Sequence, residues 1–292
     1  MTLQDAIGFG LKASIMLSVF TLGLKTSEQD VIYPFRHPGK LARSLVAMDI
    51  IMPAFAIAAI WVTVLPGPAK IALVALSVSP IPPIMPRKTT KMGGTQEYAI
   101  GLLVAASIIS LAFVPLSVGL LGVIFGVHTH GSFLAIALLM IITVLGPLAI
   151  GIFVHNNRRE IAEQVARPLG SVATVLLLIC VLPVVFKMWP QMMSLIGNGT
   201  LRVFIAFVPV GLTVGHFLGG PDPDDRTVLA IATSSRHPGV AMAIAAASFA
   251  EQKLASAAII LYLLVSVLAS FPYVFWRKRR ATNPNVPAAT RS

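Results

Sequence analysis

Long apolar segments alternate with short polar ones along the whole chain. A helix that crosses the ~30 Å hydrocarbon core of a bilayer needs about 20 mostly apolar residues. The connections are short, and the longest runs only from Lys25 to Ala42, which leaves no room for a soluble domain. The pattern predicts an all-α polytopic membrane protein with nine transmembrane helices. The nine segments are, approximately, 6–24, 43–64, 70–86, 97–118, 133–155, 168–188, 201–219, 226–250 and 254–276.

The composition agrees with this pattern. Of the 292 residues, 56% are apolar and only 11% are charged, whereas an ordinary soluble domain carries roughly 25% charged residues. A soluble globular enzyme and a disordered tail protein are therefore excluded. The single cysteine, Cys180, cannot form an intramolecular disulfide or a multi-cysteine metal site. Because it lies in the middle of a span, it is expected to be a small packing residue.

The net charge of +11 would indicate nucleic-acid binding in a soluble protein. In a chain with nine spans, however, sixteen basic residues fall in or near the connections on one side and four on the other. Because basic residues accumulate in cytoplasmic loops, this asymmetry predicts a cytoplasmic C-terminal tail over 277–292 and an N-terminus outside. No nucleic-acid partner is expected. The expected location is the bilayer of the bacterial inner membrane, where Arg277–Arg280 would anchor the last span.

Three charged residues lie inside the predicted spans: Lys12, Asp49 and Arg236. Each costs on the order of 2.5–3.5 kcal/mol at a helix centre, so such residues usually face a partner or a wet cavity. Lys12 lies close enough to a span end for its amine to reach the interface. For Asp49 two roles stay open, a structural ion-pair partner and a proton-carrying group. Arg236 lies near the midplane, where a functional role is favoured.

Two of the predicted spans contain a helix-breaking stretch. In Ala232–Gly239 a proline and a glycine follow each other, so the helix is expected to stop near Ser235 and to restart at Pro238. The first half of the chain has a counterpart in Leu76–Pro83. Paired interruptions in corresponding halves indicate a transporter site built from an internal repeat, whereas the alternative is a chance coincidence of two proline kinks. An offset of 158 pairs Ser235, His237 and Pro238 with Ser77, Ser79 and Pro80. The candidate substrate-binding residues are Ser77, Ser79, Thr233, Ser234, Ser235, Arg236 and His237.

Several loose motifs follow one another in a recognisable order: Leu22–Asp30, Arg36–Lys40, Ile51–Pro53, Gly211–Gly219, Arg226 and the break at Arg236–Gly239. Together they resemble the bile acid:sodium symporter family, from about residue 15 to residue 276. The resemblance implies an inverted repeat with two broken helices that cross near the midplane. It also implies a core, over about 43–118 and 201–276, and a panel whose movement against the core exposes the site alternately to each side. The panel spans are 6–24, 133–155 and 168–188.

The departures from the family pattern concern the sodium sites. Sodium-coupled members carry a Glu and a Gln-Asn pair in the second broken helix, and these positions here are Ala232, Arg236 and His237. The Gln before their Met-Pro falls at Met48, and Pro80–Pro83 replaces their Ser-Asn ligands. Sodium prefers several hard oxygen ligands and is repelled by an arginine, so both sodium sites are expected to be dismantled. Arg236 would then act as a fixed cation or bind a substrate anion through its planar fork.

The resemblance thus implies a secondary transporter for a small organic anion that is not coupled to sodium. Asp49 and His237 are the candidates for proton coupling, and uncoupled transport is the alternative. Other open interpretations are an auxin-carrier or arsenite-type permease and a non-transporting membrane sensor of the same fold. No enzyme motif of the type G-x-G-D, H-E-x-x-H or G-x-S-x-G is present, so an enzyme is not expected.

No cofactor and no metal are expected. His128 and His130 lack a third ligand nearby, and a zinc site needs at least three protein ligands. Asp222, Asp224 and Asp225 precede Arg226 without the spacing of a calcium loop, and acids in this position are typical of a helix N-cap.

Overall fold

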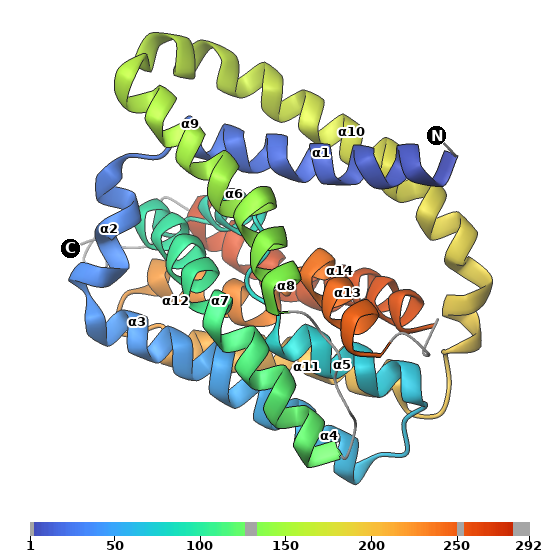
Figure 1. The fold of residues 1–292 in the computed structure, drawn as a ribbon. Helices are drawn as coiled ribbons and strands as arrows, with labels where there is room; N and C mark the ends of the chain where they lie inside the picture. The colour runs from blue at the N-terminus through green and yellow to red at the C-terminus, as the bar shows by residue number, and fades with distance from the viewer. Residues whose placement is uncertain (1–2, 126–132, 250–253, 283–292) are drawn as a thin grey trace.

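The computed structural model describes residues 3–125, 133–249 and 254–282 (Figure 1). Within these ranges the chain forms helices with short connections and no β-strand, so the all-α prediction is confirmed. His128, His130 and the tail beyond Thr282 lie outside the described residues. The elements are α1 (Leu3–Gly23), α2 (Glu28–Arg36), α3 (Pro38–Leu45), the π-helical η1 (Val46–Ile51), α4 (Met52–Val62), α5 (Gly67–Val78), α6 (Met85–Thr90), α7 (Gln96–Phe125), α8 (Phe133–Met140), the π-helical η2 (Ile141–Leu145), α9 (Gly146–Asn157), α10 (Arg159–Ser194), α11 (Thr200–Leu218), α12 (Pro223–Ser234), α13 (Pro238–Ser248) and α14 (Ala255–Thr282).

Six helices in the described ranges are long and apolar enough to cross a membrane, judged by length and composition. The other three predicted spans do not form a single long α-helix. The span 70–86 contains α5 and then a non-helical stretch, and 226–250 is split into α12 and α13. The span 133–155 is helical throughout, with the π-helical η2 between α8 and α9. The nine-span topology therefore stays a prediction.

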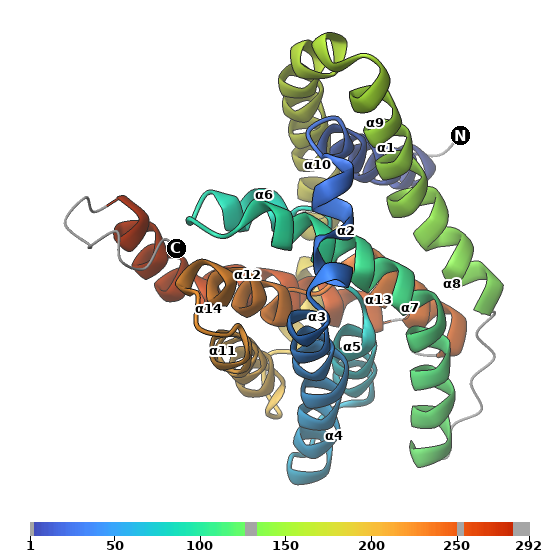
Figure 2. The ribbon, with the colours of Figure 1, turned by 90° about the vertical axis from the view of Figure 1, so that its left-hand side faces the viewer.

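Helices α1, α9 and α10 pack together on one side of the molecule (Figures 1 and 2). Glycines allow the close approach: a Cβ on Gly23 would lie 2.9 Å from the Cα of Gly151, and one on Gly10 would lie 2.5 Å from the sulfur of Cys180. Cys180 is buried there, as expected for a small packing residue. These three helices are joined by a small apolar cluster that is separate from the main core and has Leu24, Ala162 and Ala166 at its centre.

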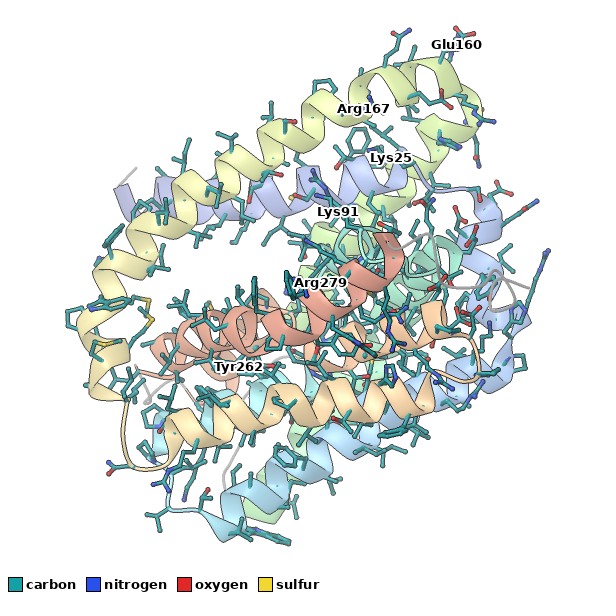
Figure 3. The ribbon with its side chains drawn as sticks, turned by 180° about the vertical axis from the view of Figure 1, so that it is seen from behind. Lys25, Lys91, Glu160, Arg167, Tyr262 and Arg279 are labelled. Carbon is teal, nitrogen blue, oxygen red and sulfur yellow. The ribbon has the colours of Figure 1, made fainter. Side chains whose placement is uncertain are left out.

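The main apolar core lies mostly among the remaining helices, and Val19 of α1, Leu148 of α9 and Met192 of α10 also belong to it. Gly211 and Gly215 of α11, together with Gly219 directly after it, face α12, and a Cβ on Gly215 would lie 2.6 Å from the Cα of Ala230. In a membrane, where close packing rather than the hydrophobic effect drives helix association, small residues four apart allow two backbones to approach. Earlier on the same face of α11, Tyr262 of α14 (Figure 3) packs edge-on against Phe204 and Phe207. These contacts fix the end of α12, where the second interruption begins.

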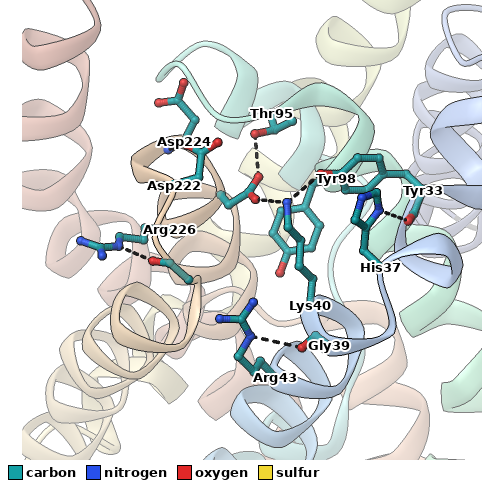
Figure 4. A network of polar contacts seen from close by, with 12 residues as sticks. Tyr33, His37, Gly39, Lys40, Arg43, Thr95, Tyr98, Asp222, Asp224 and Arg226 are labelled. Atoms are coloured by element: carbon teal, nitrogen blue, oxygen red, sulfur yellow. Dashed lines mark hydrogen bonds and ion pairs between the residues drawn. The ribbon is translucent and has the colours of Figure 1, made fainter. Parts of the chain in front are cut away.

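A polar network joins α2, α3, the start of α7 and α12 at one end of the core (Figure 4). Lys40 Nζ donates to Asp225 Oδ2 at 2.5 Å and to the Tyr33 hydroxyl at 2.8 Å. Thr95 Oγ1 donates to the other carboxylate oxygen of Asp225 at 2.7 Å. Asp225 is only 1% exposed, so these donors replace the water that would otherwise solvate its charge.

The three acids before Arg226 have three different roles. Asp222 caps α12 by accepting a hydrogen bond from the backbone N–H of Asp224 at 2.8 Å, which confirms the cap prediction for this residue. Asp224 accepts from Arg277 at 3.2 Å, and Asp225 belongs to the network above. Arg277 is 5% exposed and also donates to the Pro223 carbonyl at 2.8 Å. It therefore ties α14 to α12, and the anchoring role expected of the run Arg277–Arg280 stays a prediction.

Breaking the Lys40–Asp225 pair should destabilise the protein. Lys40→Met leaves a buried carboxylate without its cation, which costs roughly 3–5 kcal/mol in buried pairs, and we expect the lower part of this range because Lys40 is partly exposed. The matched control is Arg159→Gln, which removes an exposed pair with Glu163 and should cost under about 0.5 kcal/mol. Unfolding of both variants in detergent, followed by circular dichroism, measures the difference; equal losses would contradict this role of Lys40.

Gly215→Ala should push α11 away from α12. We expect a loss of about 1–3 kcal/mol in the free energy of unfolding, as is typical of overpacking. The control is Gly8→Ala, because a Cβ on Gly8 meets nothing within 4 Å, and alanine in a helix should be neutral or favourable by up to about 1 kcal/mol. Thermal unfolding compares the two variants, and a Gly215→Ala protein as stable as the control would show that the helices are not in close contact.

Candidate functional site

The second interruption lies where the sequence predicts it. α12 ends at Ser234, Ser235 follows in an extended conformation with φ −103° and ψ 134°, and α13 begins at Pro238. Proline suits the first turn of a helix because its missing N–H would have no intrahelical partner there. The chain is therefore non-helical over residues 235–237, in the middle of the predicted span.

The first interruption, after α5, is longer than the second, and the helix that follows it, α6, is shorter than α13. α5 ends at Val78, Ser79 is extended, and helical structure resumes only in the six-residue α6. Counted from the helix ends, Val78 corresponds to Ser234, which gives an offset of 156 instead of the predicted 158. By this count Ser79 is matched with Ser235, and the internal repeat itself stays a prediction. The prediction differs by two because it aligned prolines, and the first proline stands two residues beyond its helix end while the second stands four beyond.

Arg236 bridges the two interruptions. Its Nη1 donates to the Ser79 carbonyl at 3.2 Å, and its Nη2 donates to the Met48 carbonyl at 3.1 Å. The neighbouring backbone N–H of His237 donates to the Pro80 carbonyl at 2.9 Å. Arg236 is 3% exposed. One buried guanidinium thus links the end of α5, the break after α12 and the π-helical segment η1.

The backbone of η1 explains why the Met48 carbonyl is available to Arg236. Met48 lies within a π-helical segment, where hydrogen bonds span five residues instead of four. The residue five positions after Met48 is Pro53, which has no N–H to donate. Arg236 supplies a donor from the break between α12 and α13.

The charge of Arg236 suits the helix ends around it. α5 and α12 both end beside this side chain, and the C-terminal end of a helix carries unpaired carbonyls and about half a negative charge. The Ser234 carbonyl at the end of α12 accepts a hydrogen bond from the Tyr262 hydroxyl at 3.0 Å. Asp49, half-buried in η1, acts on Arg236 through its charge. The guanidinium therefore balances negative charge from three elements.

Two N–H donors at the interruptions have no acceptor in the described part of the chain: Arg236 Nε and His237 Nε2, both buried. His237 Nδ1 accepts a hydrogen bond from the backbone N–H of Val240 at 3.3 Å and so caps α13. A ring nitrogen that accepts carries no proton, so this hydrogen bond assigns the proton of the neutral ring to Nε2. Because buried donors are rarely left unsatisfied, an acceptor such as a carboxylate fits this position chemically.

The predicted hydroxyl residues gather at the interruptions, but four of them use their protons locally. Each of these four buried side chains donates to a backbone carbonyl three or four residues earlier, at 2.8–3.2 Å. Their oxygens retain lone pairs and can accept a hydrogen bond. Ser235 is half-buried. The four residues are Ser77, Ser79, Thr233 and Ser234.

Sequence reasoning missed three contributors to this region. Met48 acts through its backbone, which no side-chain pattern reveals, although Pro53 was an indirect signal. Tyr262 is fully buried, and a tyrosine inside an apolar span was a usable signal. The Phe207 ring centre lies 5.9 Å from the guanidinium carbon of Arg236, and nothing in the sequence distinguishes this residue from other core phenylalanines.

A pocket of about 650 Å³ lies elsewhere, at the α4–α5 and α10–α11 connections, where Thr63, Asn198 and Arg202 contribute to its lining. Arg236 and His237 do not line it and are both buried, so the interruptions are closed in this conformation. The described residues contain no group of three or more His, Cys, Asp or Glu side chains that could hold a metal ion.

The chain matches the family model described as Sodium Bile acid symporter family over residues 13–194, which is 182 of its 292 residues. The matched region runs from α1 to the end of α10 and includes Asp49, Ser77 and Ser79. The second interruption lies beyond it, so the match is shorter than the resemblance that extends to residue 276. No curated protein matches the chain significantly. Because the match covers more than half of its length, the chain belongs to the sodium bile acid symporter family.

Proposed function

We propose that this protein is a secondary transporter that moves a small organic anion across the membrane by alternating access and without sodium coupling. Its family indicates a membrane transporter and not an enzyme, and its long apolar helices agree with an integral membrane protein. One observation carries the finer statement. Where two interrupted helices meet, Arg236 and His237 each present a buried N–H donor that has no acceptor among the described residues.

A carboxylate supplies the hydrogen-bond acceptors that these two buried donors lack. Hydrogen bonds to charged groups contribute about 1.5–3 kcal/mol each, and the N-terminal end of α13, which begins beside His237, adds a favourable dipole for an anion. Because both Nη atoms of Arg236 are bound to carbonyls, Nε is the atom proposed to contact the substrate. The hydroxyl oxygens are proposed to accept hydrogen bonds from polar groups elsewhere on the substrate; they belong to Ser77, Ser79, Thr233, Ser234 and Ser235.

The position of Arg236 supports transport without sodium. The carbonyls of Met48 and Ser79 would be suitable ligands for a hard cation, but the guanidinium already binds both of them. A sodium ion about 4 Å from a unit positive charge is repelled by about 4 kcal/mol at an effective dielectric constant of about 20. Such a repulsion would weaken sodium binding by roughly a thousandfold.

Two groups of helices are proposed to move against each other. In this proposal α1, α9 and α10, which share their own apolar cluster, form the panel, and the helices that carry both interruptions form the core. The proposal includes an inner-membrane location in a bacterium, with the N-terminus outside and the C-terminus in the cytoplasm. The sixteen-to-four distribution of basic residues supports this orientation.

The residues beside the interruptions support protons as the coupling ion. Asp49 acts on Arg236 through its charge, and His237 is in contact with the first interruption through its backbone. A proton gained by either side chain would change the charge near the bound anion. Uncoupled transport is the alternative, and it would show the same independence of sodium.

Transport should not require sodium. In proteoliposomes, uptake of a carboxylate, selected from a panel by thermal stabilisation of the purified protein, should differ by less than about twofold between sodium and choline buffers, because Arg236 already supplies the positive charge. An increase of about tenfold or more in sodium would contradict the proposal. A pH gradient imposed on the same liposomes separates proton-coupled from uncoupled uptake.

Arg236→Gln should weaken binding of the selected carboxylate. The loss of a charge-assisted hydrogen bond of about 2–3 kcal/mol corresponds to roughly 30- to 150-fold weaker binding. Arg236→Lys keeps the charge without the planar fork and should have an intermediate effect. Lys12→Gln is the matched control, because it removes a basic residue that is exposed on α1. If isothermal titration gave equal affinities for Arg236→Gln and the unmodified protein, Arg236 would not be the anion ligand.

A further inference from the structure

Two adjacent basic residues of α6 lie at the boundary between the two groups of helices. The guanidinium of Arg87 reaches α10, where its Nη1 lies 3.4 Å from Thr174 Oγ1. A Cβ placed on Gly170, one turn earlier in α10, would lie 4.0 Å from the same nitrogen. Arg87 therefore packs beside Gly170 and Thr174 on the surface of α10.

Lys88 contacts α14 from the same short helix. Its Nζ lies 3.5 Å from Ser270 Oγ, and the side chain is half-buried. Burial lowers the pKa of Lys88, and the positive charge of Lys278 on α14 lowers it further. An ammonium group that is partly removed from water and lies near a like charge is stabilised when an anion binds beside it.

No acidic side chain forms an ion pair with Arg87 or Lys88 in the ranges that the structure describes. Their hydrogen-bond acceptors there are two neutral hydroxyls at 3.4 and 3.5 Å, which is the long end of hydrogen-bond distances. An anionic oxygen would be a stronger acceptor for both donors. Other acids are engaged elsewhere, in the pairs Lys40–Asp225, Arg277–Asp224 and Arg159–Glu163.

We propose that Arg87 and Lys88 form a binding site for a carboxylate or phosphate group, at the boundary between α10 and the pair α6–α14. Figure 3 shows further basic residues around this boundary, with Lys25 and Arg167 on the side of α1 and α10 and Lys91 and Arg279 on the other side. The site is separate from Arg236 and does not rest on the proposed transport. A free small anion and the headgroup of an anionic lipid present the same chemistry to it.

Binding at this site should stabilise the folded protein. An anion bound there would replace the hydroxyls of Thr174 and Ser270 as acceptors and reduce the repulsion between Lys88 and Lys278. Because these side chains contact α10 and α14, the bound anion would also strengthen the contact between the two groups of helices. A ligand that binds only the folded state raises the unfolding temperature.

Thermal unfolding of the full chain tests the site with two probes. The first is inorganic phosphate added to protein in a neutral detergent, compared with potassium chloride at equal ionic strength. The second is phosphatidylglycerol in mixed micelles, compared with phosphatidylcholine. The variant is Arg87→Gln with Lys88→Gln, and the matched control is Arg36→Gln with Arg158→Gln, which removes the same charge from exposed positions. Arg87→Gln alone provides a second, milder variant that carries the test if the double variant does not fold.

The unmodified protein and the Arg36/Arg158 control should be stabilised by at least one probe, and the Arg87/Lys88 variant should need about tenfold more of it, because two charge-assisted contacts are lost. Stabilisation by phosphate identifies a free anion as a ligand, and stabilisation by phosphatidylglycerol identifies a lipid headgroup. The proposal is overturned if neither probe stabilises the unmodified protein, or if the Arg87 and Lys88 substitutions leave the stabilisation unchanged.

Discussion

The hydrogen bonds from Arg236 to the carbonyls of Ser79 and Met48 hold together the part of the fold on which the rest depends. Two helices that break inside an apolar protein leave unpaired carbonyls and two negative helix ends in a medium that cannot solvate them. Arg236 provides two donors and a full positive charge at that point. The protein thus contains its own cation at the meeting point of α5 and α12, and this cation cannot leave.

The same interruptions create the chemistry of the candidate site. α13 restarts with His237 as its cap, and this cap uses Nδ1 and leaves Nε2 as a donor. Arg236 is oriented by its Nη bonds, and its Nε is the buried nitrogen that has no hydrogen-bond partner in the described part of the chain. The same two adjacent residues, Arg236 and His237, therefore stabilise the interruption and offer donors to a ligand. Both residues are buried in this conformation, so a ligand can reach them only when the site opens.

Much of this region could be predicted because proline and buried charge are strong local signals. The restart at Pro238, the interruption after α5 and the importance of Arg236 follow from single residues in an apolar context. The sequence did not reveal the contact with Met48, because it involves a backbone carbonyl released by a π-helical turn. It also did not reveal the Lys40–Asp225 pair, whose partners are 185 positions apart, since a pairing over that distance depends on how the helices pack. The number of spans stays a prediction, because interrupted helices look continuous in hydropathy but are individually too short to be recognised as spans.

The central claim is that the crossing of the two interrupted helices needs a cation, and chemical rescue tests it most directly. In Arg236→Ala the carbonyls of Met48 and Ser79 lose their donor and a guanidinium-sized space remains. Low concentrations of guanidinium chloride should then raise the unfolding temperature of this variant more than sodium chloride does, with no such effect in the unmodified protein or in Lys12→Ala. An Arg236→Ala protein that is as stable as the unmodified protein, or that gains nothing from guanidinium, would contradict this account.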